Sequence, residues 1–231
     1  MNKIHAVIRM YARDHFTWFI LPWGILLSSF FINIIIAALI NEPAGMKTGG
    51  IASIAIYLLI AGIMVIPQTF HYAIGLSVRR KDYYVGTGAM FLFVSLFSGI
   101  LISLLAVVER DFTNGWGVKL QFFNMPFLES IGVLGSILFY TILLLSMFYL
   151  GMSISSIHRR FGRTGLYTFF GIGLLLSTIF SYMAGVYGYW NDLFNGLLQM
   201  TMMDVILLLA VLTAVCAGAT YLMLRRATTQ A

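Results

Sequence analysis

Side chains suited to catalysis or metal binding are few in this chain, and they are widely separated in the sequence. The four histidines are His5, His15, His71 and His158. They form no metal-ligand spacing such as H-E-x-x-H, and there is no G-x-S-x-G nucleophile motif. In residues 45–50 Met46 stands where a P-loop needs glycine, and the single Cys216 excludes an intrachain disulfide and a cysteine metal site. We therefore expect no enzyme activity, no metal and no cofactor bound by this chain.

The densest polar cluster lies in residues 75–88, with the sequence "GLSVRRKDYYVGTG". Its charged and aromatic residues, here called the basic knot, are Arg79, Arg80, Lys81, Asp82, Tyr83 and Tyr84. Arg and Tyr are favoured at the centres of protein interfaces, because they bury a large area and still form hydrogen bonds. We expect Gly75 and Gly86 to let the chain turn at both ends of this segment. The knot would dock a cytoplasmic partner or, alternatively, anchor the chain to anionic lipid.

The elements that carry these residues are apolar enough to cross a membrane. The chain is 60% hydrophobic and only 10% charged, against about 25% charged residues in soluble domains. Its apolar runs reach the ~20 residues that a helix needs to span a bilayer. We therefore predict an all-α polytopic membrane protein with a single transmembrane domain over residues 1–231 and six spans. The predicted spans are residues 17–40, 51–70, 88–108, 130–152, 166–186 and 205–224.

Charge asymmetry between the loops predicts the orientation. With the amino terminus inside, eleven of the 14 basic residues fall in inner segments. These are Lys3, Arg9, Arg13, Arg79, Arg80, Lys81, Arg159, Arg160, Arg163, Arg225 and Arg226. Most acids, Glu42 among them, fall outside. Basic residues favour cytoplasmic loops, so we expect both termini in the cytoplasm, and no nucleic acid partner for charges held in such short loops.

Residues 1–16 precede the first span and carry an apolar face. Ile4, Val7, Ile8 and Tyr11 recur at helical spacing, with Arg9 and Arg13 pointing away. This pattern predicts an amphipathic helix lying in the inner membrane interface, the alternative being a frayed basic tail.

Three further features remain open to two interpretations each. Asn33 and Gln68, the strongly polar residues within spans, would line a transport path or bond a neighbouring helix. His158, Arg159 and Arg160 on a second inner loop would form a secondary cytoplasmic contact or anchor to lipid. Small residues at every fourth position, Ala210, Ala214 and Gly218, would pack within the subunit or form a dimer seam, the former being favoured.

Residues 70–87, "FHYAIGLSVRRKDYYVGT", resemble a loop of bacterial type-2 ABC transporter permeases, especially small six-span permeases of Gram-positive bacteria. The shared pattern is an aromatic residue, Ala-x-Gly-x-Ser, basic residues, an aromatic pair and Gly-Thr. In this chain these are Phe70, Ala73, Gly75, Ser77, Arg79, Arg80, Lys81, Tyr83, Tyr84, Gly86 and Thr87. In that family the loop is a coupling helix that seats in a groove of the ATPase subunit. The resemblance covers about 18 residues by motif and the whole chain by architecture.

The resemblance implies a permease subunit of an ATP-driven exporter in the bacterial plasma membrane. Two copies, or one copy and a sister chain, would enclose the path, and the partner ATPase subunits would bind ATP and Mg²⁺. The span interiors offer no convincing energy-coupling group, so energy would have to come from such a partner. The alternative is the substrate-binding membrane component of an energy-coupling-factor vitamin importer, which docks through small-residue helix faces.

Overall fold

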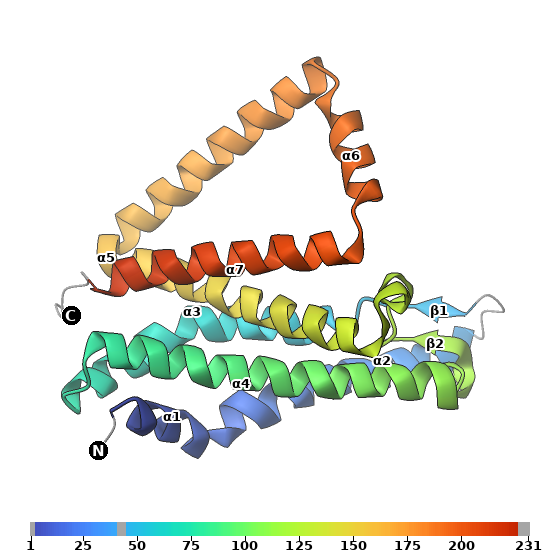
Figure 1. Ribbon diagram of the computed structural model, residues 1–231, viewed down its shortest axis with the longest axis horizontal. Helices are drawn as coiled ribbons and strands as arrows, with labels where there is room; N and C mark the ends of the chain where they lie inside the picture. Colours follow the sequence, from blue (N-terminus) through green and yellow to red (C-terminus); the bar gives the residue numbers. More distant parts are fainter. Residues whose placement is uncertain (1–2, 41–44, 226–231) are drawn as a thin grey trace.

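The computed structural model describes residues 3–40 and 45–225 and consists almost entirely of helices (Figure 1). Glu42 and Arg226, used above for the orientation, lie outside the described residues. The main helices are α1 (Lys3–Arg13), α2 (Leu21–Ile40), α3 (Ala52–Gly75), α4 (Arg80–Val107), α5 (Gly132–Val186), α6 (Tyr189–Gln199) and α7 (Met202–Arg225). Short elements complete the chain: π-helical turns at Phe16–Ile20, Val108–Phe112 and Gly115–Lys119, a 3-10 turn at Pro126–Ile131, and strands β1 (Met46–Lys47) and β2 (Leu120–Gln121).

Within residues 3–40 and 45–225, five helical segments have the length and apolar composition of membrane spans. They are Phe16–Ile40, Ala52–Gly75, Arg80–Phe112, Pro126–Val186 and Met202–Arg225. The predicted all-α class is confirmed, and the composition of these helices is that of a multi-pass membrane protein. Two predicted spans, 130–152 and 166–186, fall within the single 61-residue segment Pro126–Val186.

A break at Gly162 divides α5 into two halves, one packed in the bundle and one exposed. Gly162 has φ 70° and ψ −168°, a conformation that is open essentially to glycine alone. Residues 132–161 pack into the bundle, whereas the chain after the break rises away from it and α7 returns to it (Figure 1). Of residues 167–196, all but Ala184 are exposed. We call residues 163–199 the arm.

Glycines allow α3 and the first half of α5 to pack backbone against backbone. A Cβ atom added at Gly62 would lie 2.2 Å from the Phe148 carbonyl oxygen, and one at Gly151 would lie 2.0 Å from that of Leu59. In a bilayer the hydrophobic effect does not hold helices together, so such close packing is what joins them. Phe148 also stacks on Phe91 of α4, with 3.3 Å between ring centroids.

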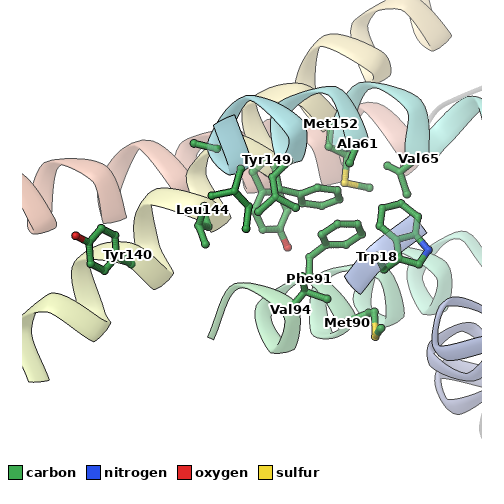
Figure 2. Close-up of a cluster of buried hydrophobic side chains, with 14 of the residues drawn as sticks. Trp18, Ala61, Val65, Met90, Phe91, Val94, Tyr140, Leu144, Tyr149 and Met152 are labelled. Atoms are coloured by element: carbon green, nitrogen blue, oxygen red, sulfur yellow. The ribbon is translucent and has the colours of Figure 1, made fainter. Parts of the chain in front are cut away.

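The core of the bundle lies where α3, α4 and α5 meet, with Trp18 closing it from the start of the first span (Figure 2). The Trp18 ring meets Phe91 edge to face with 4.9 Å between centroids. Tyr149 and Met152 enter the same cluster from α5, and Val65 enters it from α3 (Figure 2).

The amino-terminal helix forms as predicted, but part of its apolar face is buried in protein. Val7 and Tyr11 are 2% and 1% exposed because α1 packs on α4. The approach depends on Gly86, where an added Cβ would lie 2.8 Å from the Val7 Cβ. Gly86 therefore serves helix packing inside α4, and the expectation that it lets the chain turn is wrong.

The small-residue stripe on α7 does not pack against the rest of the chain. Ala214 and Gly218 are exposed, and nothing lies within 4 Å of a Cβ added at Gly218. α7 meets the bundle instead through a face that includes Ile206, Thr213 and Thr220. Within the described residues, Ala214 and Gly218 thus do not form a packing face, whereas Ala210 is half-buried.

Candidate functional site

The basic knot lies at the tight turn between α3 and α4, at one end of the bundle. The Val78 amide donates to the Ala73 carbonyl at 3.2 Å, and the Ser77 amide donates to the Ile74 carbonyl at 2.8 Å. These two bonds form a Schellman ending of α3, in which the residue after the cap is left-handed. Ser77 takes that conformation with φ 57°, so the turn is at Ser77, and the expectation that Gly75 provides it is wrong.

The charged side chains of the knot differ in exposure. Arg79 and Lys81 are exposed, whereas Arg80 and Asp82 are half-buried. Arg80 donates from Nη1 to the backbone carbonyl of Arg225, the last residue of α7, at 3.3 Å. Arg79 and Lys81 are therefore available to a partner, while Arg80 already serves a contact within the chain.

The first tyrosine of the knot is a structural residue. Tyr83 is fully buried, and its hydroxyl lies 2.8 Å from Thr69 Oγ1 on α3. The Tyr11 hydroxyl lies 2.9 Å from the same Thr69 oxygen and 3.1 Å from Thr87 Oγ1. Burial raises the pKa of the Tyr11 phenol, and its hydrogen bonds to Thr69 and Thr87 offset part of that rise. This network joins α1, α3 and α4 just inside the turn.

The second tyrosine joins α4 to α7. The Tyr84 hydroxyl donates to the Ala217 carbonyl at 2.8 Å, and its ring lies 5.3 Å from that of Tyr221. Together with the bond from Arg80 to Arg225, this contact holds the first turns of α4 against the last turns of α7.

The amino-terminal helix reaches the turn directly. Lys3 Nζ donates to the Ser77 carbonyl, at the residue where the backbone is left-handed. The turn is thus bonded to α1 on one side and, through the start of α4, to α7 on the other. The turn and the first residues of α4 thus connect α3 with α1 and α7.

Residues 158–160, predicted to lie on a loop, are helical within α5, and one of them lies near the knot. Arg159 Nη1 lies 2.6 Å from His71 Nε2 on α3, and its guanidinium lies 5.1 Å from the centre of the Phe70 ring. His158 and Arg160 are exposed. The structure therefore brings Arg159 to the end of α3 and leaves the other two on the surface.

The two candidate path residues have different surroundings. Asn33 is half-buried and donates from Nδ2 to the Ser29 carbonyl of its own helix at 2.8 Å. Gln68 is exposed on α3, two turns before that helix ends at Gly75. The Asn33 amide is thus hydrogen-bonded within its own helix, and the Gln68 side chain lies on the surface of the protein.

Glu109, at the other end of α4, is a site that sequence reasoning missed. It is 1% exposed, and its carboxylate accepts hydrogen bonds from Trp116 Nε1 at 2.7 Å and from the backbone amides of Phe122, Phe123 and Asn124 at 3.0, 3.0 and 2.8 Å. The loop between Glu109 and these donors is folded tightly around the carboxylate, with Asn114 and Trp116 at positive φ. These hydrogen bonds fix the loop around Glu109. Within residues 3–40 and 45–225, no three His, Cys, Asp or Glu side chains gather as a metal site.

No family model matches the chain, and neither a curated protein nor a solved structure does. The resemblance to type-2 permeases therefore rests on residues 70–87 and on the order of the helices.

Proposed function

We propose that the chain is the membrane-spanning permease subunit of an ATP-driven exporter and couples to separate ATPase subunits through the turn between α3 and α4. The observation that carries the proposal is the bonding of this turn to α1 and α7, with Arg79 and Lys81 left exposed at its surface. A docking element must present side chains to its partner and be fixed to the elements that it moves. This turn meets both requirements.

Six spans are the arrangement that the helix lengths support. A helix rises about 1.5 Å per residue, so the 61 residues of Pro126–Val186 would reach about 90 Å, three times a bilayer core of about 30 Å. A break at Gly162 allows this segment to cross twice. Six spans place both termini on one side, and the positive-inside rule makes that side the cytoplasm of a bacterial plasma membrane. The exposed Arg9 and Arg13 of α1 would then face the cytoplasm at the inner interface.

The coupling would be mechanical. ATP and Mg²⁺ would bind to the ATPase subunits, and their closure would push on Arg79 and Lys81. The Schellman turn would pass this displacement to α3, Lys3 would pass it to α1, and Arg80 would pass it to α7. The spans would then rock between inward-open and outward-open states.

A dimer of permeases, or a pair with a sister chain, would form the path. The exposed arm supports this arrangement, because it stands away from its own bundle (Figure 1). Such a long apolar surface is covered by lipid or by another chain, and a second permease would cover it on the path side.

The test is the reversal of one exposed charge at the turn. In Arg79→Glu we expect a partner ATPase to be lost from a mild-detergent pull-down of the tagged chain, as measured by mass spectrometry. Arg13→Glu, an equally exposed inner arginine on α1, is the matched control and should retain the ATPase. An ATPase that stays bound at full stoichiometry to the Arg79→Glu chain would contradict the coupling role.

A second candidate function is the substrate-binding membrane component of a vitamin importer. It is favoured by the exposed small-residue face of α7, at Ala214 and Gly218, because such components dock through faces of this kind. Tight binding of a vitamin by the isolated chain, together with insensitivity of ATPase recruitment to Arg79→Glu, would support it over the exporter.

A further inference from the structure

A basic pocket lies beside the turn, between the start of α4 and the end of α7. Its volume is about 330 Å³, and it is lined by Arg80, Lys81, Tyr221, Leu224 and Arg225. Three of these five lining residues are cationic and none is acidic. Three cations gathered at one pocket repel one another unless an anion joins them, so the pocket suits an anionic group.

Phosphate is the anion that this side-chain set fits best. Guanidinium groups bind phosphate oxygens through paired hydrogen bonds, and an ammonium adds a point charge. α4 begins at Arg80, and the amino-terminal end of a helix carries a partial positive charge that favours an anion, whereas the carboxyl-terminal end of α7 at Arg225 carries the opposite partial charge. The attraction for an anion therefore comes from the three cationic side chains. Arg80 Nη1 also donates to the Arg225 carbonyl at 3.3 Å, which joins the two sides of the pocket.

The surroundings of the pocket point to a lipid as the source of the phosphate. The pocket lies at the ends of two helices of membrane-spanning length, where the headgroups of a bilayer lie. Leu224 gives it an apolar wall, and α7 continues from it with exposed Leu222, Val215 and Val211. A phosphate held by the arginines would thus have its acyl chains along an apolar helix, which an acidic peptide would not use.

We propose that this pocket binds the phosphodiester headgroup of an anionic phospholipid from the inner leaflet. The lipid would bridge Arg80 and Lys81 at the start of α4 and Arg225 at the end of α7. Basic pockets between membrane helices on the cytoplasmic side are suited to such headgroups. The pocket shares Arg80 and Lys81 with the proposed coupling path, whereas Arg79, the residue that tests the ATPase contact, does not line it. The lipid experiment uses no ATPase, so its failure is distinguishable from a failure of the proposed function.

The experiment uses the purified full-length chain without any partner. The chain would be incorporated into nanodiscs of phosphatidylglycerol mixed with phosphatidylcholine and released for native mass spectrometry, which counts retained lipids. We expect phosphatidylglycerol to be retained over phosphatidylcholine, and Arg80→Gln/Arg225→Gln to lower that preference about tenfold, equivalent to about 1.4 kcal/mol. The matched control Arg9→Gln/Arg13→Gln removes the same charge from exposed sites on α1 and should keep the preference.

The outcomes separate the lipid from other anions. Displacement of phosphatidylglycerol by excess inorganic phosphate would identify a free-anion site and overturn the lipid assignment, as would an equal loss in both double variants. If Arg80→Gln/Arg225→Gln does not fold, the exposed Lys81→Gln replaces it, and an unchanged lipid preference in that variant would contradict the proposal. Loss of ATPase recruitment in Arg79→Glu leaves this result untouched, so the two proposals fail independently.

Discussion

At the scale of single residues, the polar groups that contribute most to holding the fold together are those whose hydrogen bonds are buried in the protein. The Tyr83 hydroxyl and the Glu109 carboxylate are both buried, and both hold separate segments together. In the interior of a protein such bonds are strong relative to leaving the groups unpaired. These two residues therefore fix the two ends of α4.

Glu109→Gln tests the carboxylate directly. The amide nitrogen would face an N–H donor, and the charge that strengthens the remaining bonds would be lost. We expect a loss of roughly 2–4 kcal/mol in the free energy of unfolding. The measurement is thermal unfolding in detergent, with protease cleavage within residues 113–124 as a local readout. Asp192→Asn, at an exposed site on α6, should change neither, and a stable Glu109→Gln protein with an intact loop would contradict this role.

Sequence reasoning located the knot but not the roles of its members. A tyrosine that follows four charged residues has the composition of an interface, and nothing in its neighbours indicates that Tyr83 turns inward to Thr69. The role of Glu109 is harder to predict from the sequence, because most of its donors are backbone amides 13–15 residues later. Every residue except proline has a backbone amide, so the sequence does not show which amides bind a carboxylate. Only the folded structure identifies such a site.

At the scale of elements, the presence of long apolar helices was easier to predict than the residues at which they begin and end. The third span was predicted from residue 88, yet α4 begins at Arg80. Hydropathy cannot detect a helix that continues through charged residues beyond the apolar run. The turn at Ser77 was missed for a related reason, because glycine is favoured at a left-handed position while hydrogen bonds from Ser77 and Val78 can stabilise serine there.

The close contact of α3 and α5 makes a prediction at this scale. Gly62→Ala would place a methyl group 2.2 Å from the Phe148 carbonyl oxygen and force the two backbones apart. Overpacking of this kind costs about 1–3 kcal/mol, which we expect to lower the midpoint of thermal unfolding by several degrees. Gly171→Ala is the control, because a Cβ there meets nothing within 4 Å. Equal midpoints for the two variants would show that the contact is not tight in solution.

At the scale of the whole molecule, the proposed six-span arrangement depends on the break at Gly162, because it divides the segment Pro126–Val186 into two possible spans. With six spans, Arg160 lies inside and Asn191, in α6, lies outside. In a Cys216→Ser background, Asn191→Cys should react with a membrane-impermeant maleimide on intact cells, and Arg160→Cys should react only after permeabilisation. Labelling of Arg160→Cys on intact cells would contradict the six-span arrangement.

The glycine contacts between α3 and α5 also limit how the molecule can move. Two helices whose backbones touch at Gly62 and Gly151 cannot slide past each other without a clash, so they behave as one rigid strut. A displacement at Ser77 would tilt this strut as a whole and carry residue 161 with it. The arm is joined to this strut at Gly162 and, at its other end, to α7, which packs on the bundle. A tilt of the strut would therefore reach the arm from one end at Gly162, while α7 holds the other end.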